Sequence, residues 1–175
     1  MGKNTYTKIG KNIPQKPIIS YILYGFSNIF FFRIVRLILI RLTMKNCRDI
    51  DFEPGFRFFY GRNVFAENVY FSNCFIYDYE KVIIGEHTQF GKDNKIITAS
   101  HDLYERKLIL AKPVTIGKNV WITNNCIILP GVSIGDNSVI GAGSIVTKDI
   151  PANCLAAGNP CRIIRKLDAA RIKSF

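Results

Sequence analysis

His101 is the side chain in this sequence that is best suited to acid–base chemistry. It lies in the segment Thr98-Ala-Ser-His-Asp102, and the only other histidine is His87. An imidazole changes its charge near neutral pH, so it can accept a proton from a hydroxyl group and later return it. The Ser-His-Asp triplet is not a protease-like triad, because neighbours in an extended chain point to opposite faces. We therefore predict a general base at His101 and a turn residue at His87.

A second group of residues, in the last third of the chain, is suited to bind phosphate. Thr147 and Lys148 offer a hydroxyl group and a cation, and Arg162 and Arg165 follow on a short basic segment. A guanidinium group matches the geometry of phosphate oxygens. Ahead of them, the small residue Ala142 would let a narrow ligand lie against the backbone. The alternative is a basic, solvated end of the fold.

The elements that would position these residues follow from a repeat of six residues. Apolar side chains recur at this period on both sides of residues 102–112, at Ile84, Phe90, Ile96, Ile116, Ile122, Ile128, Ile134, Ile140 and Val146. Three residues after most of them stands Gly, Asn, Asp or His, the types that best tolerate a positive φ. A period of six agrees with strand alternation and disagrees with 3.6 residues per helical turn. The sequence therefore predicts coils of short strands, interrupted by a loop at 102–112.

This pattern of aliphatic residue, Gly, any residue, Asn and small residue resembles the hexapeptide repeat of left-handed β-helix acyltransferases. The resemblance covers about residues 55–167, and Gly135–Pro151 is its most specific segment. It implies an all-β core, namely a left-handed parallel β-helix, and a homotrimer. We expect this domain at 51–167, after a basic apolar helical extension at 1–50 and before a short C-terminal helix or tail at 168–175. The register of residues 60–80 stays open, with Val64 and Phe71 as candidate coil residues.

The resemblance also implies roles for the chemical residues. The context of His101 is similar to that in maltose and galactoside O-acetyltransferases, and Ser-His-Asp is similar to exopolysaccharide and capsule acetyltransferases. This implies acetyl-CoA as cosubstrate, His101 as catalytic base and no required metal. For acetyl-CoA binding it implies Trp121, Asn124, Ala142, Thr147, Lys148, Arg162 and Arg165.

The acceptor side departs from the sugar acetyltransferases. Counting back from Ile84 without a gap puts Phe71 where they carry Asn, and Tyr79 where they carry an acidic residue. Asn73 would serve if the coil shifts by two residues, and Asp102 is the second acceptor candidate. We predict acetyl transfer to a sugar hydroxyl, in the synthesis or modification of a surface polysaccharide. The identity of the acceptor does not follow from the sequence.

Other functions fit parts of the pattern. An N-acetyltransferase acting on an amino sugar, free or nucleotide-linked, would need the base at His101 less, because a free amine is already a nucleophile. A zinc enzyme of the gamma-type carbonic anhydrase kind would need three histidines, and the chain has two. A non-catalytic binding coil would not need the set of His101, Trp121 and Thr147-Lys148. A covalent route through Cys74 or Cys126 lacks a neighbouring base.

Charge and apolar character are concentrated at the N-terminus. The net charge is +11, and residues 1–48 carry nine of the 24 basic residues and none of the 13 acidic ones. In residues 49–175 the basic and acidic residues nearly balance, so this part of the chain offers no large basic face for binding nucleic acid. About 15 uncharged residues precede Arg33, fewer than a transmembrane helix needs. We expect 18–42 to lie as an interfacial helix on the inner face of the cytoplasmic membrane, or equally to pack on the β-helix. Five irregularly spaced cysteines without a CxxC motif favour a reducing cytoplasm.

Overall fold

Short strands stacked in successive coils make up almost all of the part of the chain that the structure describes. The computed structural model describes residues 7–9, 38, 40–53 and 55–173. Its elements are β1 (Thr7–Ile9), β2 (Cys47–Phe52), β3 (Arg57–Phe58), β4 (Val64–Phe71), β5 (Cys74–Tyr77), β6 (Val82–Ile84), β7 (Gln89–Phe90), β8 (Asn94–Ile97), β9 (Ala99–His101), β10 (Ile109–Ala111), β11 (Val114–Ile116), β12 (Trp121–Ile122), β13 (Ile127–Ile128), β14 (Ser133–Ile134), β15 (Val139–Ile140), β16 (Ile145–Val146), β17 (Cys154–Ala157), β18 (Arg162–Lys166) and the 3-10 helix η1 (Ala169–Arg171).

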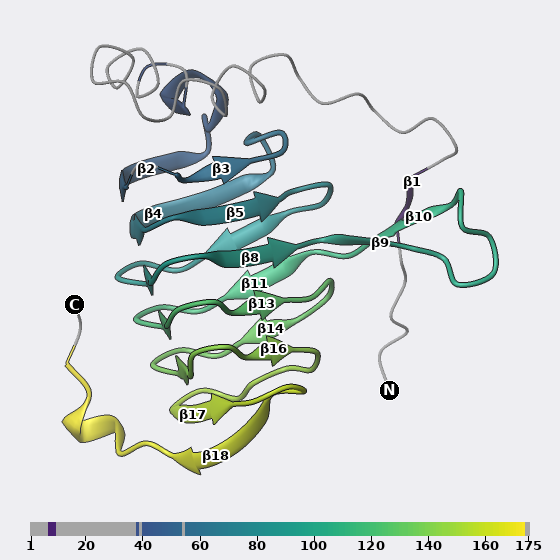
Figure 1. Ribbon diagram of the computed structural model, residues 1–175. Helices are drawn as coiled ribbons and strands as arrows, with labels where there is room; N and C mark the ends of the chain where they lie inside the picture. The colour runs from purple at the N-terminus through teal and green to yellow at the C-terminus, as the bar shows by residue number, and fades with distance from the viewer. Residues whose placement is uncertain (1–6, 10–37, 39, 54, 174–175) are drawn as a thin grey trace.

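The strands of consecutive coils pair in parallel and form three faces (Figure 1). The first face contains β6, β11 and β14, the second contains β7, β12, β15 and β17, and the third contains β3, β5, β8, β13 and β16. The long strand β4 pairs with β6 at its start and with β7 at its end, so it links the first two faces. This arrangement is a parallel β-helix, as the six-residue period predicts.

The repeated apolar residues form the core of the column. Each of the nine residues at the period of six is at most 4% exposed, and Val64 and Phe71 are fully buried as well. In the upper coils the rings of Phe56, Phe71 and Phe90 stack, with centroids 4.8 and 5.1 Å apart along the column. Successive coils therefore bury one continuous apolar stripe, which is the main source of stability in such a repeat.

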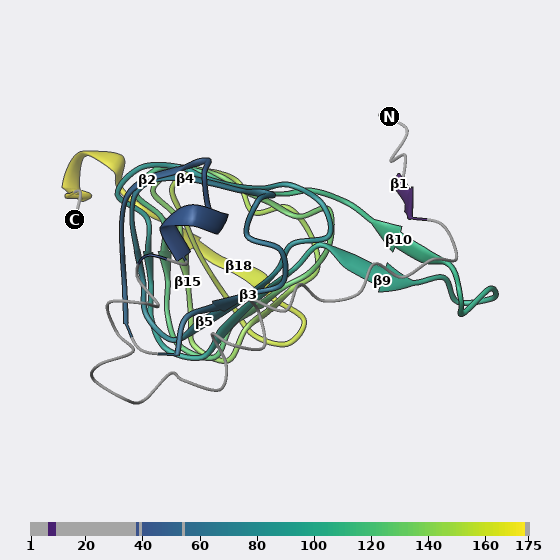
Figure 2. The ribbon, with the colours of Figure 1, turned by 90° about the horizontal axis from the view of Figure 1, so that it is seen from above.

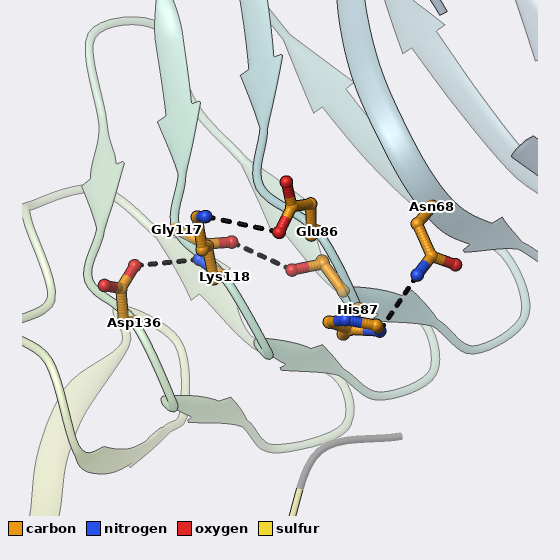
Figure 3. A network of polar contacts seen from close by, with 7 residues as sticks. Asn68, Glu86, His87, Gly117, Lys118 and Asp136 are labelled. Carbon is orange, nitrogen blue, oxygen red and sulfur yellow. Dashed lines mark hydrogen bonds and ion pairs between the residues drawn. The ribbon is translucent and has the colours of Figure 1, made fainter. Parts of the chain in front are cut away.

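The corners of the coils depend on the turn residues of the repeat. The φ angle is positive at His87, Asp93, Asn119, Asn125, Gly131, Asn137 and Gly143. The corner that contains residues 85–88, 117–120 and 135–138 is closed by polar contacts between coils (Figure 3). There Nδ2 of Asn68 lies 3.1 Å from Nδ1 of His87, and Oδ1 of Asp136 accepts the N–H of Lys118. His87 is thus a turn residue of the scaffold, as predicted.

The interruption of the repeat is a β-hairpin and not an irregular loop. Strands β9 and β10 pair antiparallel, and β1 adds a third strand on the outer edge of β10. Figures 1 and 2 show this three-stranded sheet projecting from one corner of the column. Only residues 102–108 form the connecting turn. The prediction of a loop at 102–112 was therefore wrong for residues 109–111, because pairing with β9 decides their conformation.

The boundary at the start of the column differs from the prediction. Strand β2 pairs in parallel with β4, so the first coil begins at Cys47, four residues before the predicted start of the domain at residue 51. Of the predicted extension at 1–50, residues 7–9 form a strand and 40–43 are helical, while 10–37 lie outside the described residues. At the other end β18 folds back antiparallel on β17, and η1 follows as the expected short C-terminal helix.

The last described turn of the extension packs on the end of the column. Ile40 and Met44 are buried, whereas Ile38 and Leu42 are 53% and 61% exposed. In the part of the chain that the structure describes, no helix has the length and apolarity needed to cross a membrane.

Candidate functional site

His101 ends strand β9, and its ring is held by the turn of the same hairpin. Its Nδ1 atom lies 2.6 Å from the backbone carbonyl oxygen of Arg106. A carbonyl oxygen only accepts hydrogen bonds, so Nδ1 carries the proton in this contact. The other ring nitrogen, Nε2, then keeps its lone pair in the neutral imidazole. The side chain is exposed, so Nε2 is available to a substrate hydroxyl group.

The base of the hairpin is fastened to the third face by a buried threonine. The Thr98 hydroxyl donates a hydrogen bond of 2.8 Å to the carbonyl of Tyr77 and accepts one of 3.0 Å from the N–H of Glu80. The N–H of Lys112 donates to the carbonyl of Thr98 across the two hairpin strands. The start of β9 is thus fixed in relation to β5, and this contact sets where His101 stands.

A cavity of about 260 Å³ opens beside His101. Its described lining consists of Tyr77, Tyr79, Ala99, Ser100, His101 and Ile109. Ala99, Ile109 and Ala111 form a small buried cluster against which Tyr79 packs. The cavity is therefore mainly apolar and aromatic, with the imidazole as its reactive group, which suits a small organic ligand.

The two predicted acceptor residues lie in different places. Oδ1 of Asp102 accepts the N–H groups of Tyr104 and Glu105, both at 2.8 Å, which shapes the turn of the hairpin next to His101. Asn73 stands between β4 and β5, at the opposite end of β5 from the hairpin, and its amide donates to Oδ1 of Asp93 at 2.5 Å. Within one chain the structure brings Asp102, and not Asn73, close to His101.

The residues predicted to bind acetyl-CoA lie in three places on the column. Trp121 stands on the second face and is 45% exposed, in a register column that continues through Val139 and Leu155 to Arg165. Arg162 belongs to the same strand β18 as Arg165. Thr147 and Lys148 instead follow β16, at the corner from which the hairpin projects, two coils below it.

Asn124 and Ala142 stand on the corner that joins the second face to the third. Both are exposed, and the carbonyl of Asn124 accepts the N–H of Gly143 in the next coil. Oδ1 of Asn124 also accepts the N–H of Lys92 at 2.8 Å. A Cβ at Gly143 would meet no atom within 4 Å, so the surface is open there. The corner presents backbone and small side chains to the outside, which suits a thin, extended ligand.

The cysteines do not offer a nucleophile. Cys74 and Cys126 are buried, and burial raises the pKa of both thiols. Burial likewise raises the pKa of Cys47 to about 11. A thiol with a raised pKa is protonated at neutral pH and attacks poorly.

Among the described residues, no three His, Cys, Asp or Glu side chains are grouped so that they could hold a metal ion.

Tyr77, Ser100 and Ile109 are cavity residues that the sequence prediction missed. A signal for Tyr77 was present, since Phe75, Tyr77 and Tyr79 alternate at a spacing of two and so share one face of an extended chain. Ile109 could not be found in this way, because it lay in the segment predicted to be an irregular loop.

The comparisons with known proteins agree with this architecture. The family model for the bacterial transferase hexapeptide (six repeats) matches residues 113–148. A putative acetyltransferase of Saccharomyces cerevisiae, YJL218W, is 45% identical over 136 residues, which cover 74% of this chain and 69% of the relative. Other curated relatives are matched over 58–62% of their own length.

Two solved structures extend the similarity to the whole fold. A maltose O-acetyltransferase from Clostridium difficile 630 is 38% identical with a TM-score of 0.78, over 86% of this chain and 85% of that chain. A galactoside acetyltransferase in complex with coenzyme A is 35% identical with a TM-score of 0.72, over 89% of this chain and 84% of that chain. The chain therefore belongs to the hexapeptide-repeat acetyltransferase family.

Proposed function

We propose that this protein transfers the acetyl group of acetyl-CoA to a hydroxyl group of a sugar. The observation that carries the proposal is the hydrogen bond between Nδ1 of His101 and the carbonyl oxygen of Arg106. It leaves Nε2 as the basic atom of a side chain that lines a cavity large enough for part of a sugar. The matched maltose and galactoside enzymes, and the bound coenzyme A in one of them, support the two substrate classes.

The reaction is a direct transfer. Nε2 of His101 removes the proton of the acceptor hydroxyl as its oxygen attacks the thioester carbonyl carbon, and a tetrahedral intermediate forms. When the C–S bond breaks, the imidazolium returns the proton to the leaving thiolate of coenzyme A. The carbonyl of Arg106 stabilises the imidazolium that forms in between, because Nδ1–H stays hydrogen bonded to it.

A homotrimer would complete the site. Within one chain, His101 stands on the hairpin while Trp121, Asn124 and Ala142 stand on the second face and its far corner. Figure 2 shows the hairpin pointing away from its own column. We propose that it reaches the acetyl-CoA surface of a neighbouring copy, so that each site lies between two chains. Sedimentation equilibrium tests this, and a protein that is monomeric at assay concentration would contradict it.

The release of free thiol from acetyl-CoA tests the activity. We expect release with at least one member of a panel of neutral sugars, amino sugars and glycosides, with mass spectrometry identifying an ester product. His101→Ala should lower turnover by about 10²–10⁴-fold while acetyl-CoA still binds. His87→Asn is the matched control, because Asn tolerates the positive φ at that corner. Unchanged turnover in His101→Ala would remove this residue from the mechanism, and an amide product would show an N-acetyltransferase.

We further propose that the acceptor is an intermediate of surface-polysaccharide synthesis and that residues 18–42 rest on anionic lipid. The basic charge of this segment and the exposed Ile38 and Leu42 support it. The buried Ile40 and Met44 support the alternative, in which the segment packs on the column. Co-sedimentation with phosphatidylglycerol vesicles at low salt separates the two. Binding that is equal in the native protein and in the Arg33→Glu/Arg36→Glu variant would contradict the membrane proposal.

A further inference from the structure

An outward-facing row of aromatic side chains leads along the third face to the cavity of His101. Along and just beyond β5, Cys74, Ile76 and Asp78 point inward and are buried, so Phe75, Tyr77 and Tyr79 point outward. The rings of Tyr77 and Tyr79 lie with their centroids 5.0 Å apart, and those of Phe75 and Tyr77 lie 5.7 Å apart. The last two members of this row, Tyr77 and Tyr79, are the aromatic wall of the cavity.

The aromatic wall is supported from behind by the turn that precedes β4. The ring of Phe59 stacks on Tyr79 at 4.8 Å, and Tyr60 meets the edge of the same ring at 5.6 Å. This turn is held by the buried carboxyl group of Asp78, whose Oδ1 accepts the N–H groups of Phe59 and Tyr60. Because the rings are packed in this way, the wall is preorganised and loses little freedom when a ligand binds.

The chemistry of the cavity differs from that of a site that reads hydroxyl groups with carboxylates. None of the six described lining residues is acidic. Burial raises the pKa of the Tyr79 hydroxyl, so it remains neutral. The face of an aromatic ring carries partial negative charge and so attracts the weakly positive C–H groups of a sugar. The attraction is strongest when those C–H groups lie flat against the ring. A ring with a flat C–H face therefore fits this wall better than a flexible polyol does.

We propose that the acceptor is a neutral pyranoside that stacks the C–H face of its ring on Tyr79, next to Tyr77, and thereby presents one hydroxyl group to Nε2 of His101. This proposal rests on the proposed function and names the acceptor class of the same site. Tyr79 acts as a specificity residue: it selects a closed sugar ring through contact with its apolar face. Because the wall and His101 line the same cavity, stacking and proton removal act on the same sugar residue.

Steady-state kinetics with methyl β-D-galactopyranoside, methyl α-D-glucopyranoside and the corresponding alditols, galactitol and glucitol, test the proposal. Tyr79→Leu should raise the KM of the pyranoside acceptor about threefold to tenfold, with kcat and the KM of acetyl-CoA unchanged. Tyr79→Phe should behave like the native enzyme, since it keeps the ring. The alditols should be poor acceptors for both the native enzyme and Tyr79→Leu. Tyr104→Leu is the matched control, because Tyr104 is 96% exposed on the hairpin and does not line the cavity.

Binding measurements keep the proposal separable from the proposed function. Saturation-transfer NMR with methyl β-D-galactopyranoside should show contact through its ring C–H groups, weakened in Tyr79→Leu and in the second variant Tyr77→Leu. If no sugar in the panel supports thiol release and no saturation transfer is seen, both proposals are overturned. Acetyl transfer with an unchanged pyranoside KM in folded Tyr79→Leu and Tyr77→Leu would overturn the stacking proposal alone. A Tyr79→Phe variant as impaired as Tyr79→Leu would also overturn it.

Discussion

The hydroxyl group of Thr98 donates a hydrogen bond of 2.8 Å to the carbonyl oxygen of Tyr77. This contact joins the aromatic wall of the cavity to the base of the hairpin that carries His101. Thr98 is fully buried, so water cannot replace either of its two hydrogen bonds. The relative position of the wall and His101 therefore depends on one buried side chain that does not line the cavity.

Thr98→Val should destabilise the protein and displace the hairpin. The substitution keeps the shape but leaves the N–H of Glu80 without its partner, which costs about 1–3 kcal/mol of unfolding free energy. Urea denaturation measures this loss, and kcat should fall as well. Thr115→Val, on the exposed side of β11, is the matched control and should change neither quantity. Equal stability of the two variants would show that the Thr98 hydroxyl contributes little.

Asp78 should make stability depend on pH between about 4 and 6. Burial raises the pKa of its carboxyl group from 3.8 to about 6, although backbone N–H groups oppose the shift. The unfolded chain then loses this proton at lower pH than the folded one, so stability falls as the pH rises through this range. The native protein should lose about 2 kcal/mol relative to Asp78→Asn between pH 4 and pH 6.5. A difference between the two proteins that does not change with pH would contradict the assignment.

Lys148→Ala and Arg162→Ala should each raise the KM of acetyl-CoA roughly threefold to tenfold, the loss expected for one exposed charge contact with phosphate. The turnover at saturation should stay close to native, because neither residue lies at His101. Lys118→Ala is a suitable control, since its amine is bound to Glu86 at a different corner. If the KM of acetyl-CoA, measured by thiol release, is unchanged in both variants, these residues do not bind acetyl-CoA.

Removal of residues 1–9 should loosen the hairpin. Strand β1 pairs with β10 through Thr7, Lys8 and Ile9, and β10 pairs in turn with β9, where Ile109 lies opposite His101. Without β1, the outer edge of β10 is open to water, so amide hydrogen exchange in residues 109–111 should accelerate and kcat should fall about twofold to tenfold. Exchange in β13 serves as the internal reference and should not change. Protection of β10 that persists after truncation would mean that β1 does not position the base.

The repeat could be predicted from the sequence because each of its rules is local. Two rules can be read directly from the sequence: an apolar residue at every sixth position, and a residue tolerant of positive φ three places later. The structure confirms burial at the first position throughout and a positive φ at the second in seven of the nine repeats. His101 could be singled out in the same way, since it stands where the period breaks. The first coil was missed, because β2 lacks the repeat and forms by pairing with β4.

The sequence by itself predicted the solenoid, the class of reaction and the candidate base His101, because these depend on periodicity and on residue type. Only the tertiary structure decided the protonated nitrogen of His101, the hairpin that carries it and the cavity beside it. Those features come from contacts between segments far apart in the chain, such as Thr98 with Tyr77 and β1 with β10. Such contacts leave no local pattern, since a hydroxyl group or an extended segment can pair with many partners, and the packed fold selects one.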